Sequence, residues 1–298
     1  MKEIQKTQEN IQISDWGYSE LFVEKDFTAK LDFSAYNKRI SVLEYELSTT
    51  AAASKFFSLL DSLCLNNGFD KVWGKIRQDD VDTFTRYGFL NEALIRDFFA
   101  ENIDAVICSK FFGDRRFSRT PDENARILQQ IADRKKVNTK QLQSANEYSF
   151  RIAGKEDLPA LADLYREVFA TYPYPIHNTA FLESSLEHTV YGLVFRNEVL
   201  LGAASAEIDF ARANAEMTDF ATLSSEQGKG LASFILHRLE EELQKKGIKC
   251  FYSIARSTSV GMNLTFSRAS YQYTGTLVNN CNISGGFEDM NVYCKSKY

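Results

Sequence analysis

Between residues 148 and 298 the spacing of hydrophobic positions changes back and forth between the periods typical of strands and helices. Apolar residues at 158, 161, 164, 165, 168 and 169 follow the period of a helix over 157–169. Leu231, Ile235, Leu239 and Leu243 mark one face of a second helix, which ends at Gly247. A short helix is expected over 261–269, and strands over 148–152, 191–196, 199–209, 216–223, 250–255, 274–280 and 290–295. This order predicts a mixed α/β domain over 147–298.

Residues 1–113 predict a smaller α+β domain. Strands are expected over 21–24, 39–46, 71–76 and 105–111, with a helix over 51–66. Residues 114–146 are polar and predict a helical linker. Its helix is expected to start at Thr120, because Pro121 follows and Glu123 stands three residues on, which is the capping-box pattern.

One short pattern occurs in both predicted domains. The stretches FTRYGF (84–89) and FSRASY (266–271) each place an arginine between aromatic residues, and each follows a strand that carries an arginine. We predict from this repeat that the first domain is a degenerate half-copy of the second fold. A chance match is the alternative.

The composition narrows the class of protein. The chain is 44% hydrophobic and 25% charged, its longest apolar runs are too short for a membrane span, and the polar N-terminus lacks a signal sequence, so we expect a cytoplasmic protein. A net charge of −5 disfavours a nucleic-acid partner and suits a small cationic substrate. The five cysteines form no CxxC pair, so neither a metal site nor a disulfide framework is predicted.

The stretch SSEQGKGLA (224–232) lies between a predicted strand and a predicted helix. Gly228 and Gly230 allow the backbone to approach an anion, and the helix that follows offers unpaired N–H groups. A nucleotide P-loop needs Ser or Thr after Lys229, and a dinucleotide fingerprint needs a third glycine after a first strand, so both are excluded. A glycine-containing turn without a ligand is the remaining alternative.

Within this stretch, QGKGLA (227–232) matches QxxGxA, and from residue 148 onward the chain resembles the GCN5-related N-acetyltransferases (GNAT). The resemblance implies a mostly antiparallel, V-splayed sheet flanked by helices, and acetyl-CoA as co-substrate. It implies that the loop residues Gln227, Gly228, Lys229, Gly230, Leu231 and Ala232 hold the pyrophosphate, and that Phe220, Thr222, Leu223 and Asn263 also contact acetyl-CoA.

Most of the chain is similar, more specifically, to the β-lysine N-acetyltransferases. The stretches that carry this resemblance are TYPYPIHN (171–178), NAEMTDFATL (214–223), SIARSTSVGMN (253–263), TLVNNCNISGGFEDMNV (276–292), YNKRISVLE (36–44) and GFLNEALIRDFF (88–99). It implies acetylation of the ε-amine of β-lysine to give N6-acetyl-β-lysine. Another small amine (a polyamine or an aminoglycoside), a protein lysine, or a non-catalytic acyl-CoA-binding role are the alternatives. A homodimer is compatible with the sequence.

The chemistry requires a base, because an amine with a pKa of about 10.4 is protonated at neutral pH. Glu216 and Asp219 lie on the predicted fourth strand, where they face opposite sides unless a bulge intervenes. We expect Glu216 to be the base and Asp219 to anchor the substrate. A backbone N–H of the same strand would meet the oxyanion.

The family resemblance also bears on the general acid, because many members place a tyrosine where this chain has Phe266. Tyr271, Ser257, Ser259 or water are therefore the candidate proton donors.

A substrate pocket is expected beside the loop after the first helix and between the last two strands. Its candidate residues are Tyr174, His177, Asn279, Asn280 and Asn282. Turn formation is the alternative role for the three asparagines.

Overall fold

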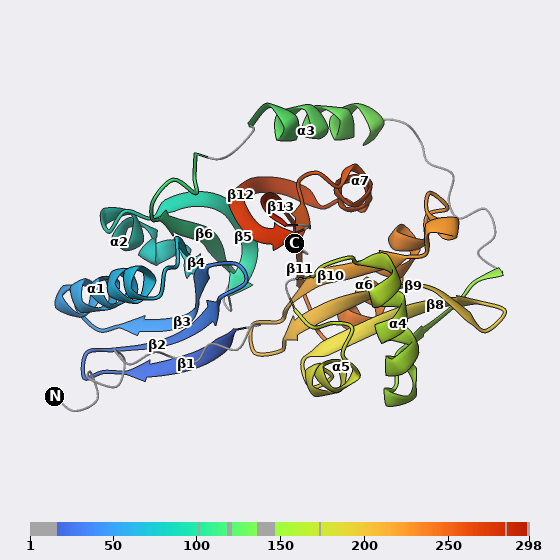
Figure 1. The fold of residues 1–298 in the computed structure, drawn as a ribbon, viewed down its shortest axis with the longest axis horizontal. Helices are drawn as coiled ribbons and strands as arrows, with labels where there is room; N and C mark the ends of the chain where they lie inside the picture. The colour runs from blue at the N-terminus through green and yellow to red at the C-terminus, as the bar shows by residue number, and fades with distance from the viewer. Residues whose placement is uncertain are drawn as a thin grey trace.

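The structure, a computed structural model, describes residues 17–99, 102–117, 121–135, 147–172, 174–283 and 285–296. Its strands form two mixed sheets that lie side by side, as Figure 1 shows. We call residues 17–117 the N-terminal half and residues 147–296 the C-terminal half. Among the described residues, no helix is long and apolar enough to cross a bilayer.

The N-terminal half holds six strands in the order β1-β2-β3-β4-β6-β5. They are β1 (Tyr18–Val23), β2 (Phe27–Ser34), β3 (Arg39–Leu47), β4 (Lys71–Arg77), β5 (Leu90–Phe99) and β6 (Ile103–Phe111), with helices α1 (Thr50–Asn66) and α2 (Val81–Arg86) and a 3₁₀ turn, η2 (Gln78–Asp80). The apolar face of α1 packs on the sheet around Phe56, Phe57 and Leu60, which are all buried.

The C-terminal half holds seven strands in the order β12-β13-β11-β10-β9-β8-β7. They are β7 (Ser149–Ile152), β8 (Thr189–Arg196), β9 (Val199–Asp209), β10 (Asn214–Thr222), β11 (Cys250–Arg256), β12 (Gln272–Ile283) and β13 (Gly286–Ser296). Its helices are α4 (Leu158–Val168), α5 (Thr179–Ser185), α6 (Leu231–Lys245) and α7 (Val260–Arg268), with 3₁₀ turns η5 (Lys155–Asp157) and η6 (Ser224–Glu226). Helices α4 and α6 pack on opposite faces of the sheet, each over its own core.

The two halves repeat one topology. In β1–β6 and in β8–β13, the third strand pairs in parallel with the fourth, and the sixth strand inserts between the fourth and the fifth. The strands β1–β6 correspond in this way to β8–β13, and α1 and α2 correspond to α6 and α7. The N-terminal half lacks counterparts of β7, α4 and α5 among its described residues. It therefore repeats the C-terminal fold without that fold's first strand and first two helices.

The FTRYGF and FSRASY stretches have the same conformation. Each ends a short helix, and the backbone N–H of the last residue of the stretch donates to the carbonyl of the first: Phe89 to Phe84 at 3.2 Å, and Tyr271 to Phe266 at 3.0 Å. The residue between helix and aromatic is left-handed in both, Gly88 at φ 86° and Ser270 at φ 70°. This is a Schellman helix end in each half.

The bulges of the two fifth strands also correspond. The register of β5 against β6 shifts between Ile95 and Phe99, and the register of β12 against β13 shifts between Leu277 and Cys281. In both strands one residue inside the shifted stretch is left-handed: Asp97 at φ 53° and Asn279 at φ 45°.

Each bulged strand reaches across to the other half, which gives the joint an approximate two-fold symmetry. Asn214, the first residue of β10, donates to the carbonyl of Phe98 (2.8 Å), and Arg39, the first residue of β3, donates to the carbonyl of Asn280 (2.5 Å). A second pair of hydrogen bonds is equivalent in the same way. The Cys250 thiol donates to the Arg96 carbonyl (3.3 Å), and the Lys71 ammonium donates to the Val278 carbonyl (3.0 Å).

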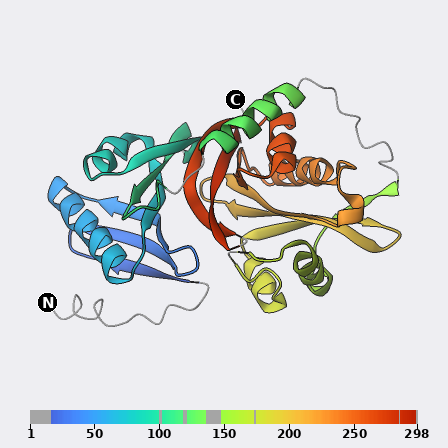
Figure 2. The same cartoon turned by 45° about the horizontal axis from the view of Figure 1, so that its top comes forward.

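The joint has a hydrophobic core of its own, built from both halves. It includes Trp73, Ile95 and Ile107 from the first and Tyr252, Leu277 and Met290 from the second. The long strands β12 and β13 lie between the halves in Figure 2. The backbones pack tightly at Gly275, where a Cβ would lie 2.0 Å from the carbonyl oxygen of Glu92, so only glycine fits there. The halves thus form one packed unit.

Helix α3 (Pro121–Lys135), the helix expected in the linker, packs along α7 (Figure 1). Ile127 and Ile131 are buried, and the Asn124 amide donates to Thr276 (3.0 Å) and Asn291 (3.1 Å). The predicted cap residue Thr120 lies outside the described residues.

Sequence reasoning missed β2 and β5. Every second residue of β2 is buried (Phe27, Ala29, Leu31, Phe33), so strict alternation was present as a signal. Strand β5 has no such signal because its bulges interrupt the alternation.

Candidate active site

Strands β10 and β11 separate in the middle of the second sheet. They pair only from Asn214 to Glu216, opposite Cys250 to Tyr252. Beyond Glu216 the described part of β10 stays paired with β9 but has no partner on its other edge. An open edge presents free backbone N–H and C=O groups, to which an extended ligand can add. The gap therefore suits a chain-like ligand such as a pantetheine arm.

A β-bulge turns Asp219 to the same face of the sheet as Glu216. The register of β10 against β9 shifts between Thr218 and Ala221, and Asp219 has φ 53°. Glu216 is paired with Glu207 of β9, while Asp219 accepts a hydrogen bond from Ser205 (2.5 Å). Ser205 and Glu207 stand two residues apart on β9 and so share a face.

A cavity of about 340 Å³ opens at the gap. The segment after α4, both separated strands, α7 and strand β12 contribute to its wall. Its lining includes Phe169, Tyr172, Met217, Thr218, Asp219, Phe220, Ser253, Arg256, Ser259, Met262, Phe266 and Cys281. Of the two carboxylates expected from the sequence, Asp219 lines this cavity, whereas Glu216 is absent from its lining.

Glu207, Glu216 and Asp219 form an acidic cluster. Burial, together with the charges of Glu216 and Asp219, raises the pKa of Glu207 to about 8, although its side chain is open to a neighbouring cavity. Burial also raises the pKa of Asp219, and hydrogen bonds from Ser205 and Tyr172 partly offset the rise. Such a cluster favours a cationic ligand, whose charge would lower these pKa values.

The N-terminal half places a lysine against this cluster. Lys75 of β4 lies 3.6 Å from the Glu216 carboxylate and donates to the Tyr252 hydroxyl at 2.9 Å. Its ammonium also faces the rings of Tyr252 (4.9 Å) and Phe98 (5.6 Å). A second cavity, of about 230 Å³, is lined here by both halves, including Trp73, Lys75, His188, Glu207 and Arg212.

The predicted anion loop lies at the N-terminus of α6. Gly228 has φ 77° and Gly230 has φ 89°, which are conformations that favour glycine. Gly230 caps the helix without a side-chain hydrogen bond, so the first N–H groups of α6 have no capping partner. These groups and the helix dipole form an anion site that fits a pyrophosphate. Thr222 and Leu223 lead into the loop from the end of β10.

Two ion pairs to one buried carboxylate hold this loop. The Glu226 carboxylate, 4% exposed, lies 2.8 Å from Arg196 and 3.1 Å from Lys229, and these cations hold the pKa of Glu226 below its ordinary value. Because Lys229 is half-exposed, its ammonium can also face a phosphate.

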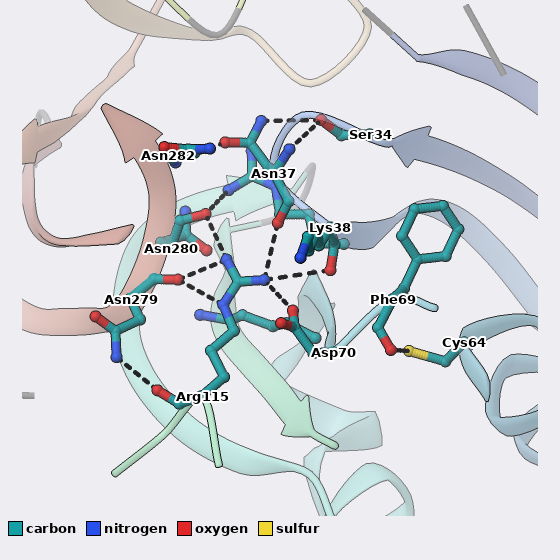
Figure 3. A network of polar contacts seen from close by, with 12 residues as sticks. Ser34, Asn37, Lys38, Cys64, Phe69, Asp70, Arg115, Asn279, Asn280 and Asn282 are labelled. Atoms are coloured by element: carbon teal, nitrogen blue, oxygen red, sulfur yellow. Dashed lines mark hydrogen bonds and ion pairs between the residues drawn. The ribbon is translucent and has the colours of Figure 1, made fainter. Parts of the chain in front are cut away.

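The three asparagines lie at the joint between the halves (Figure 3). The Asn279 and Asn280 carbonyls accept from Arg115 (2.9 and 3.4 Å), and the Asn282 amide reaches the Tyr36 carbonyl (3.3 Å). The structure does not bring them to the Asp219 cavity, so their observed contacts are those of the joint.

The other substrate candidates lie in the loop between α4 and α5. His177 is exposed, and its carbonyl accepts from Arg166. Tyr174 is half-exposed and lies close enough to Glu207 and Arg39 for their charges to act on its hydroxyl. Of these two candidate substrate residues, Tyr174 lies nearer to the acidic cluster.

Asn263, expected at acetyl-CoA, is fully buried. Its amide donates to the Arg256 carbonyl (2.8 Å) and its oxygen accepts from Asn291 and Tyr293 (2.8 and 3.0 Å). Its polar atoms are thus used in joining α7 to the sheet.

The candidate proton donors differ in position. Ser259 lines the 340 Å³ cavity, whereas Tyr271 and Ser257 are absent from its lining. Phe266 packs edge-on against Phe220 at 5.5 Å and closes one side of the cavity without offering a proton.

Sequence reasoning missed Glu207, Ser205, Tyr172 and Lys75. Glu207 interrupts a run of apolar and small residues in β9, and this break in the pattern could have singled it out. Nothing local marks Lys75, which reaches the site only through the packing of the two halves.

Comparisons with known proteins relate the chain to acetyltransferases. Residues 158–265 match the family described as the acetyltransferase (GNAT) family. The chain is 35% identical over 239 residues to a beta-lysine N(6)-acetyltransferase of Methanococcus maripaludis, which covers 79% of this chain and 86% of that protein.

Two further relatives match at similar levels. A beta-lysine N(6)-acetyltransferase of Methanosarcina mazei is 34% identical, covering 74% of this chain and 87% of the relative. The N-acetyltransferase YodP of Bacillus subtilis is 31% identical over 269 residues, covering 90% of this chain and 96% of the relative. The chain belongs to the GNAT family of acetyltransferases, and it is an N-acetyltransferase that uses acetyl-CoA as its acetyl donor.

We expect one acetyl-CoA site per chain. In the N-terminal half only Ser48 and Thr49 connect β3 to α1, and the Thr49 hydroxyl already caps α1 by accepting from the Ala52 N–H (3.1 Å). That helix end has neither a glycine loop nor an uncapped first turn. Calorimetric titration with acetyl-CoA should therefore give one equivalent, and two equivalents would mean that the N-terminal half binds CoA by another surface.

Proposed function

We propose that this protein transfers the acetyl group of acetyl-CoA to the N6 amine of β-lysine, giving N6-acetyl-β-lysine and CoA. The observation that carries the proposal is the match to two beta-lysine N(6)-acetyltransferases over 86% and 87% of their lengths. A match of 239 residues is longer than the C-terminal half, so it includes part of the N-terminal half as well. The acidic cluster supports a substrate with more than one amine.

On the donor side, the α6 loop would hold the pyrophosphate and the open edge of β10 would hold the pantetheine arm. The thioester carbonyl would then lie near the bulge, where a backbone N–H of β10 can meet the developing oxyanion. We assign these contacts to Gly228, Gly230, Leu231, Ala232 and the β10 backbone.

On the acceptor side, the ammonium must lose a proton before its nitrogen attacks the thioester carbonyl carbon. We assign Asp219 as the base that accepts this proton, because Asp219 lines the cavity and Glu216 faces Lys75. This assignment reverses the roles expected from the sequence. A raised pKa makes Asp219 a stronger base than an ordinary aspartate. The C–N bond then forms and the C–S bond breaks, and the second proton of the attacking nitrogen passes to the departing sulfur, so that CoA leaves as the thiol. Glu207 and Glu216 would hold the second ammonium.

The acceptor is tested by competition among amines. We expect kcat/KM for β-lysine to exceed that for α-lysine by about 10- to 100-fold, because moving one amine leaves a buried polar partner unsatisfied. The panel contains β-lysine, α-lysine, ornithine, spermidine and a lysine-containing peptide at equal concentration, and mass spectrometry locates the acetyl group. Spermidine or the peptide as best acceptor, or acetylation of the β-amine, would contradict the proposal.

A further inference from the structure

Arg39 is a buried cation that forms no ion pair with any residue that the structure describes. It is 4% exposed, and its guanidinium lies 4.9 Å from the centre of the Trp73 ring. Its Nη1 donates to the Asn280 carbonyl (2.5 Å) and the Cys281 thiol (3.5 Å), while its Nε finds no hydrogen-bond partner in the described part of the chain. Asp32 acts on it electrostatically, but that carboxylate accepts from Ser19 (3.0 Å) and forms no ion pair with Arg39. An uncompensated buried charge is costly and needs a reason.

Comparison of the two halves shows that the hydrogen bond across the joint does not require a charged donor. Asn214 stands at the equivalent position of the C-terminal half and makes the equivalent bond, to the Phe98 carbonyl, with a neutral amide. A guanidinium at position 39 therefore offers donors and a charge beyond what the joint requires.

Arg39 lines neither cavity itself, but two of the residues that it contacts do. Cys281, which accepts from its Nη1, lines the cavity of Asp219, and Trp73, on which it stacks, lines the cavity of Glu207 and Lys75. Tyr174 lies within electrostatic reach of both Arg39 and Glu207. Arg39 is thus a cation, in addition to Lys75, next to a site that holds three carboxylates.

We propose that Arg39 binds the carboxylate of the amino-acid substrate, so that the GNAT-like N-terminal half completes the acceptor site. The inference rests on the proposed function. In this arrangement N6 lies at Asp219, the second ammonium lies at Glu207 and Glu216, and the carboxylate lies at the guanidinium between the two cavities. A planar guanidinium suits a carboxylate because it can donate two parallel hydrogen bonds. The N-terminal half would then select amino acids over simple diamines.

The test compares β-lysine with 1,4-diaminopentane, which carries the same two amines and no carboxylate. Arg39→Gln should lower kcat/KM for β-lysine by about 10- to 100-fold and change that for the diamine by less than about twofold. Arg39→Lys, which keeps the charge and loses the planar fork, should retain part of the preference. Thermal unfolding and the Kd of acetyl-CoA establish that each variant is folded.

Arg115 provides the matched control (Figure 3). It is a buried arginine of the same joint that donates to the Asn279 carbonyl, but Asp70 pairs with its charge. Arg115→Gln should lower thermal stability and leave the ratio of the two substrates unchanged.

The outcomes separate the two proposals. If wild type acetylates N6 of β-lysine and Arg39→Gln keeps the same substrate ratio, or loses both substrates equally while folded, the role of Arg39 is wrong and the proposed function stands. If wild type does not acetylate β-lysine, the proposed function is wrong and the carboxylate site is wrong with it.

Discussion

Asp219→Asn is expected to lower kcat by about 10²- to 10⁴-fold, the usual loss when a general base is removed. The substitution keeps the shape of the side chain, and asparagine tolerates the left-handed backbone at φ 53° as aspartate does. The amide can still bond Ser205 and Tyr172, so the bulge should persist. What is lost is the ability to accept the amine proton. Steady-state kinetics over a pH series should show partial recovery at high pH, where more of the amine is already neutral.

Glu216→Gln is the matched control, because it removes a carboxylate of the same cluster that does not line the cavity of the gap. We expect it to raise KM for β-lysine more than it lowers kcat, since it would weaken binding of the second ammonium. A large fall in kcat for Glu216→Gln, with Asp219→Asn still active, would restore the assignment expected from the sequence.

Gly230→Asp is expected to weaken acetyl-CoA binding by about 10²-fold or more. A carboxylate at the first turn of α6 would stand where the loop holds the pyrophosphate, and juxtaposed like charges cost several kcal/mol. Calorimetry measures the Kd directly, and the mid-point of thermal unfolding reports any general loss of stability.

Gly247→Asp controls for backbone strain, because Gly247 has φ 87° and lies at the other end of the same helix. Both substitutions put an aspartate into a left-handed conformation, and open space surrounds the Cβ position of Gly247. Gly247→Asp should therefore share the loss of stability and keep the wild-type Kd. Equal Kd values in the two variants would remove the loop from the acetyl-CoA site.

Elements with regular periodicity could be predicted closely. Strand β9 spans Val199–Asp209, the range expected from the sequence, and helix α6 spans Leu231–Lys245, which contains the expected stripe of four apolar residues. The half-copy expected from two six-residue stretches agrees with the shared strand order, helix ends and bulges. Strand β5 could not be predicted in this way, because two register shifts break its alternation.

By itself the sequence determined the local features: the glycine loop, the uncapped helix that follows it, and the carboxylates of β10. These features depend on residues close together in the chain, because backbone preference and hydrophobic periodicity follow from the local order of residue types. The tertiary structure alone decided which of these groups meet. A bulge turned Asp219 to the face of Glu216 and Glu207, and strand β12 carried Asn279 and Asn280 to the joint instead of the pocket. Packing of the halves brought Lys75 to Glu216 and Arg39 to Cys281, because contacts between residues so distant in sequence are set by the burial of the shared core.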